Sequence, residues 1–404
     1  MNDTIARRIE ACKRYVAENV PFYQCMADKI QYDVPNFDEF PVITKNDLRW
    51  NGKLFLSDAV AGGDLIAEYT SGSTGVPLTL YKTKGEMVYL ETILNRNRRK
   101  AVANFRTLKH IKFYAELHTG DGDDRCFERI HRENNVLYFS MLCMGPADLD
   151  EYIRVIRSEA ADGAWIMGPP SVISRFAQYV VGRGMVLDNV KFVEFTGEIL
   201  FQTQRKVTEE AFHCVTRNHY GSREFWAVAY ECSSGKLHIL DEHVYVENSS
   251  HGLLVSTLDQ RTMPLIRYCI GDNCSLEEGS CACGSSSPVL KTFGGRTTEF
   301  IRTPDRREIS SILLYMIVVN LNLTYHDVIC RFRIEQTDYD AFHALLVLKP
   351  SEGDKLKTKI RDYFCDQLNL LLGYPVTVRF SYVDEISVNA RTGKFTYFVC
   401  QIPS

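Results

Sequence analysis

The middle of the chain alternates short apolar runs with segments whose apolar residues recur at helical spacing. Three apolar runs have the length of buried strands: 110–114, 164–167 and 190–195. Two segments between them, 149–159 and 172–181, have the apolar spacing of amphipathic helices. Because strands that alternate with helices form a sheet with crossover connections, this pattern predicts an α/β fold.

The residues before 110 have a helical pattern at the start and at the end of this segment. The first sixteen residues place four apolar side chains on one helical face, those of Ile5, Ile9, Cys12 and Val16. The sequence of 44–47 indicates a helix start, and a longer helix is predicted from about residue 85 to about 104. The segment before residue 110 is therefore expected to begin and end with helices, with a loop-rich part after the first helix and a further loop near residue 70.

The helical period disappears between about 236 and 272, where short strands are predicted at 237–240, 245–247 and 253–256. It returns after residue 299, in a segment that predicts two helices, 310–320 and 354–371. Strands are predicted there at 330–336, 341–348 and 376–382. This order is typical of a small α+β unit of the split βαβ type. We therefore predict a large domain over 1–297 and a small domain over 298–404.

Composition narrows the function classes. The 404 residues are enough for two or three domains, and the net charge of −4 gives no electrostatic case for nucleic acid or a membrane as a partner. The longest apolar run, 312–319, is far shorter than the roughly 20 residues of a membrane span. Thirteen cysteines, mostly scattered, and an N-terminus without a signal peptide favour a cytoplasmic protein with reduced thiols.

The most distinctive stretch is a loop that follows the strand-like Leu65 and Ile66. It carries four hydroxyl residues and two glycines in six positions: Thr70, Ser71, Gly72, Ser73, Thr74 and Gly75. Glycines let backbone N–H groups approach an anion, and hydroxyls add donors around it. The loop suits a triphosphate. It is not a Walker loop, because no Gly-Lys-Ser/Thr follows at the required spacing.

Five further motifs follow in a fixed order: TGEIL at 196–200, HYGSREF at 219–225, MPLIRYCIGD at 263–272, GGRTTEFI at 294–301 and NARTGKF at 389–395. With the hydroxyl loop, this order resembles the adenylate-forming superfamily of acyl-CoA ligases, synthetase adenylation domains and luciferases. The sequences VPFY at 20–23 and TKNDLR at 44–49 are similar to those of the phenylacetate-CoA ligase-like branch, which includes CapK-type proteins.

The resemblance implies an ATP site. The loop 70–75 would hold the β- and γ-phosphates, and Glu224 would ligate Mg²⁺ beside the α-phosphate, which suits the preference of this ion for carboxylate oxygen. Tyr220 would flank adenine, Asp272 would bind the ribose hydroxyls, and Arg296 would lie near ribose and phosphate. The same motifs add Glu198, Gly221, Ser222 and Arg223 to the nucleotide-binding set.

The resemblance also implies a mobile C-terminal lid domain that carries a catalytic lysine, Lys394. The cation would bridge the substrate carboxylate and the α-phosphate during in-line displacement. Three positions depart from the family pattern: Leu78 replaces a lysine, Thr298 an aspartate at the hinge, and Thr303 a glycine. In the family, the last two positions serve domain rotation and the CoA tunnel. We therefore expect the adenylation half-reaction to be intact, while the sequence leaves the thioester-forming half-reaction undecided.

Four residues form a separate group between 230 and 284: Cys232, His238, Cys281 and Cys283. Thiolates and imidazole in two short loops are suitable ligands for tetrahedral Zn²⁺, and a Cys-x-Cys-Gly element is common in the branch that the chain resembles. We expect a closed structural zinc site. The alternative is that Cys232 is a small buried apolar residue and the other two cysteines are loop thiols.

The sequence thus predicts an AMP-forming ligase that activates a small carboxylic acid, expected to be aromatic, and passes the acyl group to the thiol of CoA. One alternative acceptor is a carrier protein, an amine or another small nucleophile; a second alternative is a nucleotide-binding scaffold without catalysis. The acid pocket is expected around 110–145 and 195–225. Candidate wall residues, which packing could equally explain, are Tyr114, Phe192, Phe195 and Trp226. A homodimer is left open.

Overall fold

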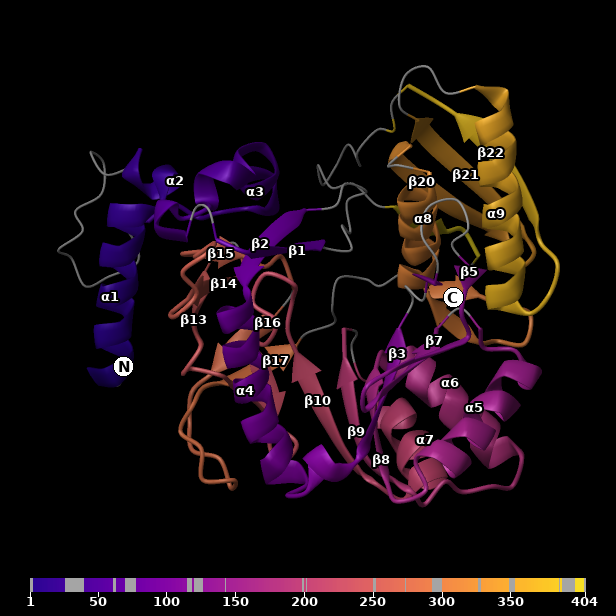
Figure 1. Cartoon of the computed structure of the whole chain (residues 1–404), viewed down its shortest axis with the longest axis horizontal. Helices are drawn as coiled ribbons and strands as arrows, with labels where there is room; N and C mark the ends of the chain where they lie inside the picture. Colours follow the sequence, from indigo (N-terminus) through magenta and orange to yellow (C-terminus); the bar gives the residue numbers. More distant parts are fainter. Residues whose placement is uncertain are drawn as a thin grey trace. The chain divides into compact units, whose positions relative to one another are not determined.

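The computed structural model (Figure 1) describes most of the chain. The residues described are 3–25, 40–60, 63–69, 78–114, 118–119, 126–141, 143–197, 200, 202–249, 252–272, 274–292, 300–325, 328–348, 353–384, 386 and 397–402. They fall into two compact units. The first takes its described residues from 1–70, 78–103 and 217–297, and the second from 104–216 and 298–404.

Helices and antiparallel strands make up the first unit. Its helices are α1 (Asp3–Asn19), α2 (Pro21–Gln24), α3 (Lys45–Asn51) and α4 (Lys84–Ala101). Its strands are β1 (Leu65–Tyr69), β2 (Thr79–Thr83), β11 (Ala229–Glu231), β12 (Leu237–Ile239), β13 (Val244–Ser249), β14 (Gly252–Thr257), β15 (Tyr268–Cys269), β16 (Cys274–Glu277) and β17 (Val289–Thr292). Strand β10 (Val215–Tyr220) straddles the boundary of the units and pairs with β11.

Local sequence explains where two of these helices begin. Thr44 precedes α3, and its side chain accepts from the Asp47 N–H while the Asp47 carboxylate accepts from the Thr44 N–H. Thr83 and Glu86 form the same reciprocal pair at the start of α4. Such capping boxes satisfy N–H groups that have no partner inside the helix. The predicted helix start at 44–47 is confirmed, and α4 ends three residues earlier than expected.

The core of the first unit lies between α1 and the strands. The predicted apolar face of α1 is buried through Ile9, Cys12 and Val16, which belong to one apolar cluster with residues of β13, β14 and β15. Strands β13, β14 and β15 form an antiparallel sheet. Strands β10, β11, β12, β17 and β16 pair in that order, each pair antiparallel.

The first half of the second unit confirms the α/β prediction. Strands β9 (Val190–Thr196), β8 (Ala164–Gly168), β3 (Lys109–Tyr114) and β7 (Val136–Ser140) pair in parallel, and β6 (Ile130–Glu133) adds an antiparallel edge. Helices α5 (Pro146–Glu159), α6 (Pro170–Gly182) and α7 (Gln202–Phe212) connect or follow them and lie together beside these strands (Figure 1). Strands β4 (His118–Thr119) and β5 (Cys126–Phe127) pair antiparallel.

The C-terminal segment has the predicted split βαβ pattern. Its elements are β18 (Phe300–Arg302), β19 (Glu308–Ser310), α8 (Ile312–Thr324), β20 (Ile329–Asp338), β21 (Ala341–Leu348), α9 (Asp354–Leu372), β22 (Thr377–Tyr382) and β23 (Phe398–Cys400). The order across the sheet is β22, β21, β20, β23, with β21 and β22 parallel and joined by α9. The expected division into domains 1–297 and 298–404, with its boundary at 297–298, and the mobility of the lid stay predictions.

Helix α8 contains the longest apolar run of the sequence. Leu314, Ile317 and Leu321 are fully buried, and so is the polar Asn320 that interrupts the pattern. A helix that is apolar on nearly every side is typical of a protein core. In the part of the chain that the structure describes, no helix combines the length and the apolar character that crossing a membrane requires.

Candidate functional site

The HYGSREF motif leaves the end of β10 and forms a tight turn before β11, inside the first unit. Its glycine is required by packing. A Cβ on Gly221 would lie 1.8 Å from the Trp226 carbonyl oxygen, a distance at which the turn cannot close. Trp226 itself has a φ of +59°, in the left-handed region that few non-glycine residues occupy. The predicted site residue Gly221 therefore permits a close approach of two backbone segments.

Tyr220 and Asp272 meet although 52 positions separate them. The Tyr220 hydroxyl donates a 2.7 Å hydrogen bond to Asp272 Oδ2. Burial, and then the charge of Asp272, raise the pKa of Tyr220, so its hydroxyl keeps the proton that it donates. The two residues predicted to contact adenine and ribose are thus neighbours in the folded chain.

Glu224 lies within the same turn and is 8% exposed. Its Oε1 accepts a 2.8 Å hydrogen bond from the Tyr268 hydroxyl, which belongs to β15. The Ser222 hydroxyl is buried and has no hydrogen-bond partner among the residues described. A buried carboxylate and an unpartnered hydroxyl two positions apart in one turn fit a site for an ion or a polar ligand, because buried polar atoms normally have partners.

A buried ion pair ties the same turn to the hydroxyl loop's flanking strands. Lys82 Nζ on β2 lies 2.6 Å from Glu68 Oε2 on β1, and it donates a 2.8 Å hydrogen bond to the Arg223 carbonyl. The Trp226 Nε1 donates to the same Glu68 oxygen at 2.7 Å. Burial lowers the pKa of Lys82, while the charge of Glu68 opposes this effect.

Sequence reasoning missed Lys82, although a signal was present. Strand β2 alternates half-buried and buried positions, and Lys82 shares the buried parity with Leu80. A lysine at a position of core parity requires a partner. Leu78 precedes the strand and is 3% exposed within the apolar cluster of the first unit, which explains an apolar residue where the wider family has lysine.

Several predicted residues lie outside those that the structure describes: Thr70, Ser71, Gly72, Ser73, Thr74, Gly75, Glu198, Arg296, Thr298 and Lys394. The strands on either side of the hydroxyl loop are described, and they pair antiparallel with Tyr69 opposite Thr79 in the register. The side chain of Arg223 is half-exposed, with Nη1 3.9 Å from Glu68 Oε1.

The four predicted zinc ligands come together. The ligand atoms of Cys232, His238, Cys281 and Cys283 all lie within 4.8 Å of one another. The sulfurs of Cys232 and Cys281 are 3.9 Å apart, and Cys283 Sγ is 3.4 Å from His238 Nε2. His238 Nδ1 donates to the Ser287 carbonyl at 2.8 Å, which leaves Nε2 free to act as a ligand.

The chemistry of this cluster suits a metal. A hydrogen bond from the Cys283 backbone, followed by one from the His238 side chain, lowers the pKa of Cys281 to about 6. Three sulfurs and one imidazole nitrogen match the donor set of a closed tetrahedral zinc site. A cavity of about 540 Å³ reaches the cluster and is also lined by Lys100, Arg217 and Glu231.

Thr303 has a structural role in the turn between β18 and β19. It is 1% exposed, and its hydroxyl accepts from the Arg307 N–H at 2.9 Å and contacts Asp305. A glycine there would lose these bonds. The departure from the family pattern at this position is thus explained by the local turn.

The candidate wall residues have different surroundings. Phe192 and Phe195 are fully buried on β9, and Phe192 stacks on Trp165 with ring centres 6.0 Å apart, which supports the packing alternative for both. Lys112 Nζ lies 5.0 Å from the Tyr114 ring centre. The location of the acid pocket stays a prediction.

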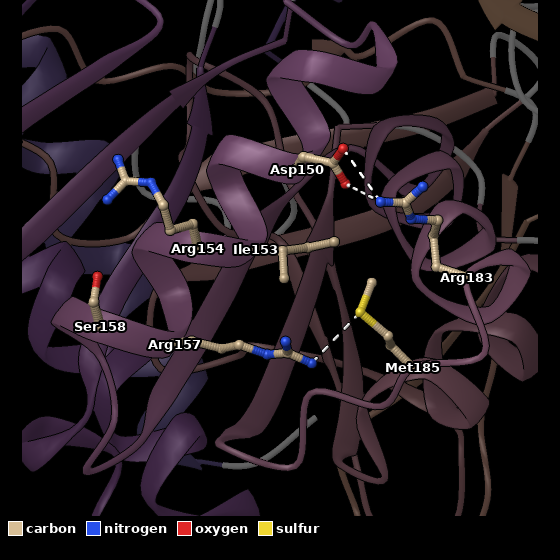
Figure 2. Close-up of a pocket in the computed structure, with 7 residues that line it drawn as sticks. All are labelled: Asp150, Ile153, Arg154, Arg157, Ser158, Arg183 and Met185. Carbon is tan, nitrogen blue, oxygen red and sulfur yellow. Dashed lines mark hydrogen bonds and ion pairs between the residues drawn. The ribbon is translucent and has the colours of Figure 1, made fainter.

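Figure 2 shows a second cavity, of about 510 Å³, on the surface of the second unit. It lies between α5 and the residues that follow α6. Arg183 pairs with Asp150 at 3.2 Å across it, and Arg157 Nη2 contacts Met185 Sδ at 3.5 Å. None of its lining residues belongs to the sequence motifs, so it adds nothing to the predicted site.

Comparisons with known proteins identify sequence relatives of the chain. No protein-family model matches it. CapK of Staphylococcus aureus is 24% identical over 404 residues, covering 94% of this chain and 85% of CapK. Phenylacetate-coenzyme A ligase of Thermus thermophilus is 23% identical over 318 residues, covering 73% of this chain and 70% of the ligase. Indoleacetate–lysine synthetase of Pseudomonas savastanoi is 28% identical over 116 residues, which cover 28% of this chain and 29% of the synthetase.

Among solved structures, 2-hydroxyisobutyryl-CoA ligase in complex with 2-HIB-AMP and CoA is similar over 99% of this chain and 90% of that one. The TM-score is 0.61 at 16% sequence identity, which shows a shared fold. The sequence relatives confirm the resemblance of the chain to the adenylate-forming superfamily of ligases, and the solved structure shares its fold.

Proposed function

We propose that the protein activates a small carboxylic acid with ATP and then transfers the acyl group to a thiol, by default that of CoA. In the first step a carboxylate oxygen attacks the α-phosphorus, the bond to the β-phosphate oxygen breaks, and pyrophosphate leaves. In the second step the thiol sulfur attacks the acyl carbon, AMP leaves, and the thiol proton is released.

The observation that carries this proposal is the hydrogen bond between Tyr220 and Asp272. Two motifs far apart in sequence supply an aromatic ring and a carboxylate at one place in the first unit. The Asp272 carboxylate can accept from both ribose hydroxyls, and the Tyr220 hydroxyl fixes its orientation. Adenine would lie against the ring of Tyr220, where stacking requires no particular hydrogen bonds.

The phosphate end of the nucleotide would be held by Glu224 and the hydroxyl loop. Glu224 would offer a carboxylate oxygen to Mg²⁺, and the unpartnered Ser222 hydroxyl, two positions away in the same turn, would be a further donor. Bound Mg²⁺ would neutralise phosphate charge as the pyrophosphate leaves. Thr70–Gly75 would contribute backbone N–H groups and hydroxyls to the β- and γ-phosphates.

Lys394 would complete the site from the small domain. Its ammonium would lie between the attacking carboxylate and the α-phosphate and stabilise the negative charge of the transition state. Binding of a nucleotide alone has no need for this cation. The combination of Lys394 with Glu224 and Asp272 therefore favours catalysis over a scaffold role.

The acceptor has a second candidate, an amine or a carrier protein. One relative is an indoleacetate–lysine synthetase, and lysine is an amino acid with a free amine. Thr298 and Thr303 also depart from the family pattern where the CoA tunnel is expected. An aromatic acid as substrate rests on the resemblance to the phenylacetate-CoA ligase-like branch.

We also propose that Cys232, His238, Cys281 and Cys283 hold a structural Zn²⁺. Four protein ligands leave no open position, so the ion would stabilise strands β11 and β12 and the loop before β17 without entering the reaction.

An ATP–pyrophosphate exchange screen with a panel of carboxylic acids tests the proposal. Exchange with one acid, followed by thioester formation on addition of CoA, is the expected result. Exchange without thioester, including with pantetheine, would point to the alternative acceptors. If no acid supports exchange while ATP still binds, the enzymatic function is wrong.

A further inference from the structure

Four consecutive carbonyl groups in the turn around Glu224 each accept a hydrogen bond from a different side chain. Lys82 Nζ donates to Arg223 at 2.8 Å, Gln260 Nε2 to Glu224 at 3.3 Å, His243 Nε2 to Phe225 at 2.9 Å, and His219 Nε2 to Trp226 at 3.1 Å. We call these four donors the carbonyl clamp. They come from four separate segments: β2, β10, the residue before β13, and the turn after β14.

The clamp is buried. The exposed fractions of Lys82, His219, His243 and Gln260 are 1%, 7%, 0% and 5%. Because a carbonyl can only accept, both histidines must carry their proton on Nε2. Glu68 balances the charge of Lys82 at 2.6 Å. Each donor is therefore committed to its carbonyl in surroundings where an unmade hydrogen bond is costly.

A turn between strands has carbonyls without ladder partners, so such bonds could serve folding alone. The arrangement here goes further, because the bonded carbonyls run without a gap through Glu224. Those of Arg223 and Glu224 fix the peptide planes on either side of the Glu224 Cα, and hence the direction of its side chain. The Tyr268 hydroxyl then holds the carboxylate itself. Groups that orient a metal ligand in this way set its affinity.

We infer that the carbonyl clamp consists of positioning residues that hold the Glu224 carboxylate ready for the Mg²⁺ of the nucleotide. The inference rests on the proposed function of Glu224. It assigns Lys82, His219, His243 and Gln260 an effect on Mg²⁺-dependent ATP binding, although none of them is placed on the nucleotide.

The test measures ATP binding by calorimetry, once with Mg²⁺ and once with EDTA. Gln260→Met keeps the side-chain length and removes the donor. Lys82→Met with Glu68→Gln removes the first donor without leaving a buried carboxylate unpaired. We expect each variant to lose about 10- to 100-fold in affinity for ATP with Mg²⁺. Affinity for ATP in EDTA should stay as in the unaltered protein.

A double-mutant cycle shows whether the clamp acts through Glu224. In a Glu224→Gln background, Gln260→Met should cause no further loss of Mg²⁺-dependent affinity, because the ligand is already gone. Tyr152→Phe is a matched control: it removes a buried hydroxyl that donates to the Ser140 carbonyl at 3.0 Å in the second unit. It should lower stability and leave the Mg²⁺ dependence unchanged.

The outcomes separate the inference from the proposed function. If the unaltered protein binds ATP equally with and without Mg²⁺, the proposed role of Glu224 fails. If it shows the dependence and Gln260→Met binds ATP with Mg²⁺ normally, or weakens binding equally in EDTA, the clamp inference is wrong. If the Lys82 and Glu68 double variant does not fold, the result for Gln260→Met is sufficient to test the clamp inference.

Discussion

Tyr220 and Asp272 are joined by a 2.7 Å hydrogen bond from the phenol to the carboxylate. The bond connects the end of β10 with the loop after β15 and brings two sequence motifs to one place. It also orients the carboxylate, because a charged acceptor with a fixed donor keeps its remaining lone pairs in fixed directions.

Replacing Asp272 should remove recognition of the ribose. Asp272→Ala is expected to weaken ATP binding by about 10- to 100-fold, the value of hydrogen bonds to a charged group. It should also abolish the preference for ATP over 2′,3′-dideoxy-ATP, which lacks both hydroxyls. Tyr220→Phe should reduce that preference only partly. Competition binding with the two nucleotides measures this, and an undiminished preference in Asp272→Ala would place the ribose elsewhere.

Gly221→Ala should prevent the Glu224 turn from closing, since the new Cβ would lie 1.8 Å from the Trp226 carbonyl oxygen. We expect a loss of about 1–3 kcal/mol in the free energy of unfolding, typical of overpacking, together with loss of ATP binding. Gly182→Ala is the control, because no atom would lie within 4 Å of its Cβ. A Gly221→Ala protein as stable as the control would contradict the described turn.

The free energy of unfolding should decrease as the pH is lowered, because of His243. Burial lowers its pKa from 6.5 to about 4; the carbonyl bond to Phe225 and the charge of Asp259 oppose this effect, and the charges of Arg8 and Lys82 add to it. The folded state therefore binds fewer protons than the unfolded state between these values. The contribution of neutral His243 to the free energy of unfolding is fully present above pH 6.5. About 3 kcal/mol of it is lost as the pH falls towards 4.

Urea unfolding of the unaltered protein and of His243→Gln at pH 7.5, 5.5 and 4.5 checks this expectation. The difference in unfolding free energy between the two proteins should shrink as the pH falls. A difference that is constant with pH would show that His243 does not titrate differently in the folded and unfolded states.

Protein purified without added metal should contain about one Zn²⁺ per chain if the Cys–His cluster binds it. Cys283→Ser should lower the metal content and the melting temperature, and a chelator should do the same to the unaltered protein. Cys365→Ser, a half-buried cysteine of α9 outside the cluster, serves as the control. A protein that is fully folded and contains no metal would contradict the proposed zinc site.

Lys394→Ala should abolish adenylation while the large domain stays folded. Removing one group that stabilises transition-state charge typically costs about 10²- to 10³-fold in rate. Pyrophosphate exchange with the identified acid measures the effect, and circular dichroism tests the fold. Lys355→Ala, an exposed lysine at the start of α9, should exchange normally. Unchanged exchange in Lys394→Ala would refute the assigned role.

Local sequence alone predicted a large part of the fold. Thr44 and Thr83 start helices because the partner of each lies three residues away. Strand β21 was predicted at its observed bounds, since its buried and half-buried positions alternate. Short strands such as β11 and β23 were missed because three residues carry too little periodic signal.

The candidate site was only partly accessible from the sequence. The motifs identified Tyr220, Glu224 and Asp272, and the cysteine spacing identified the four residues of the Cys–His cluster. The donors of the carbonyl clamp were not identified as a group, since Lys82 lies 141 positions from the carbonyl that it contacts. No motif marks such a contact.

The sequence by itself determined the order of the chemical groups, the superfamily they resemble and most of the periodic elements, because these depend on neighbours within a few residues. Only the tertiary structure decided which of those groups meet: the Tyr220 hydroxyl on Asp272, and Lys82 and Gln260 on the turn of Glu224. It also explained Leu78 and Thr303, whose identities follow from burial and a local turn. The physical reason is that burial and long-range hydrogen bonds depend on distances in space, which separation along the chain does not determine.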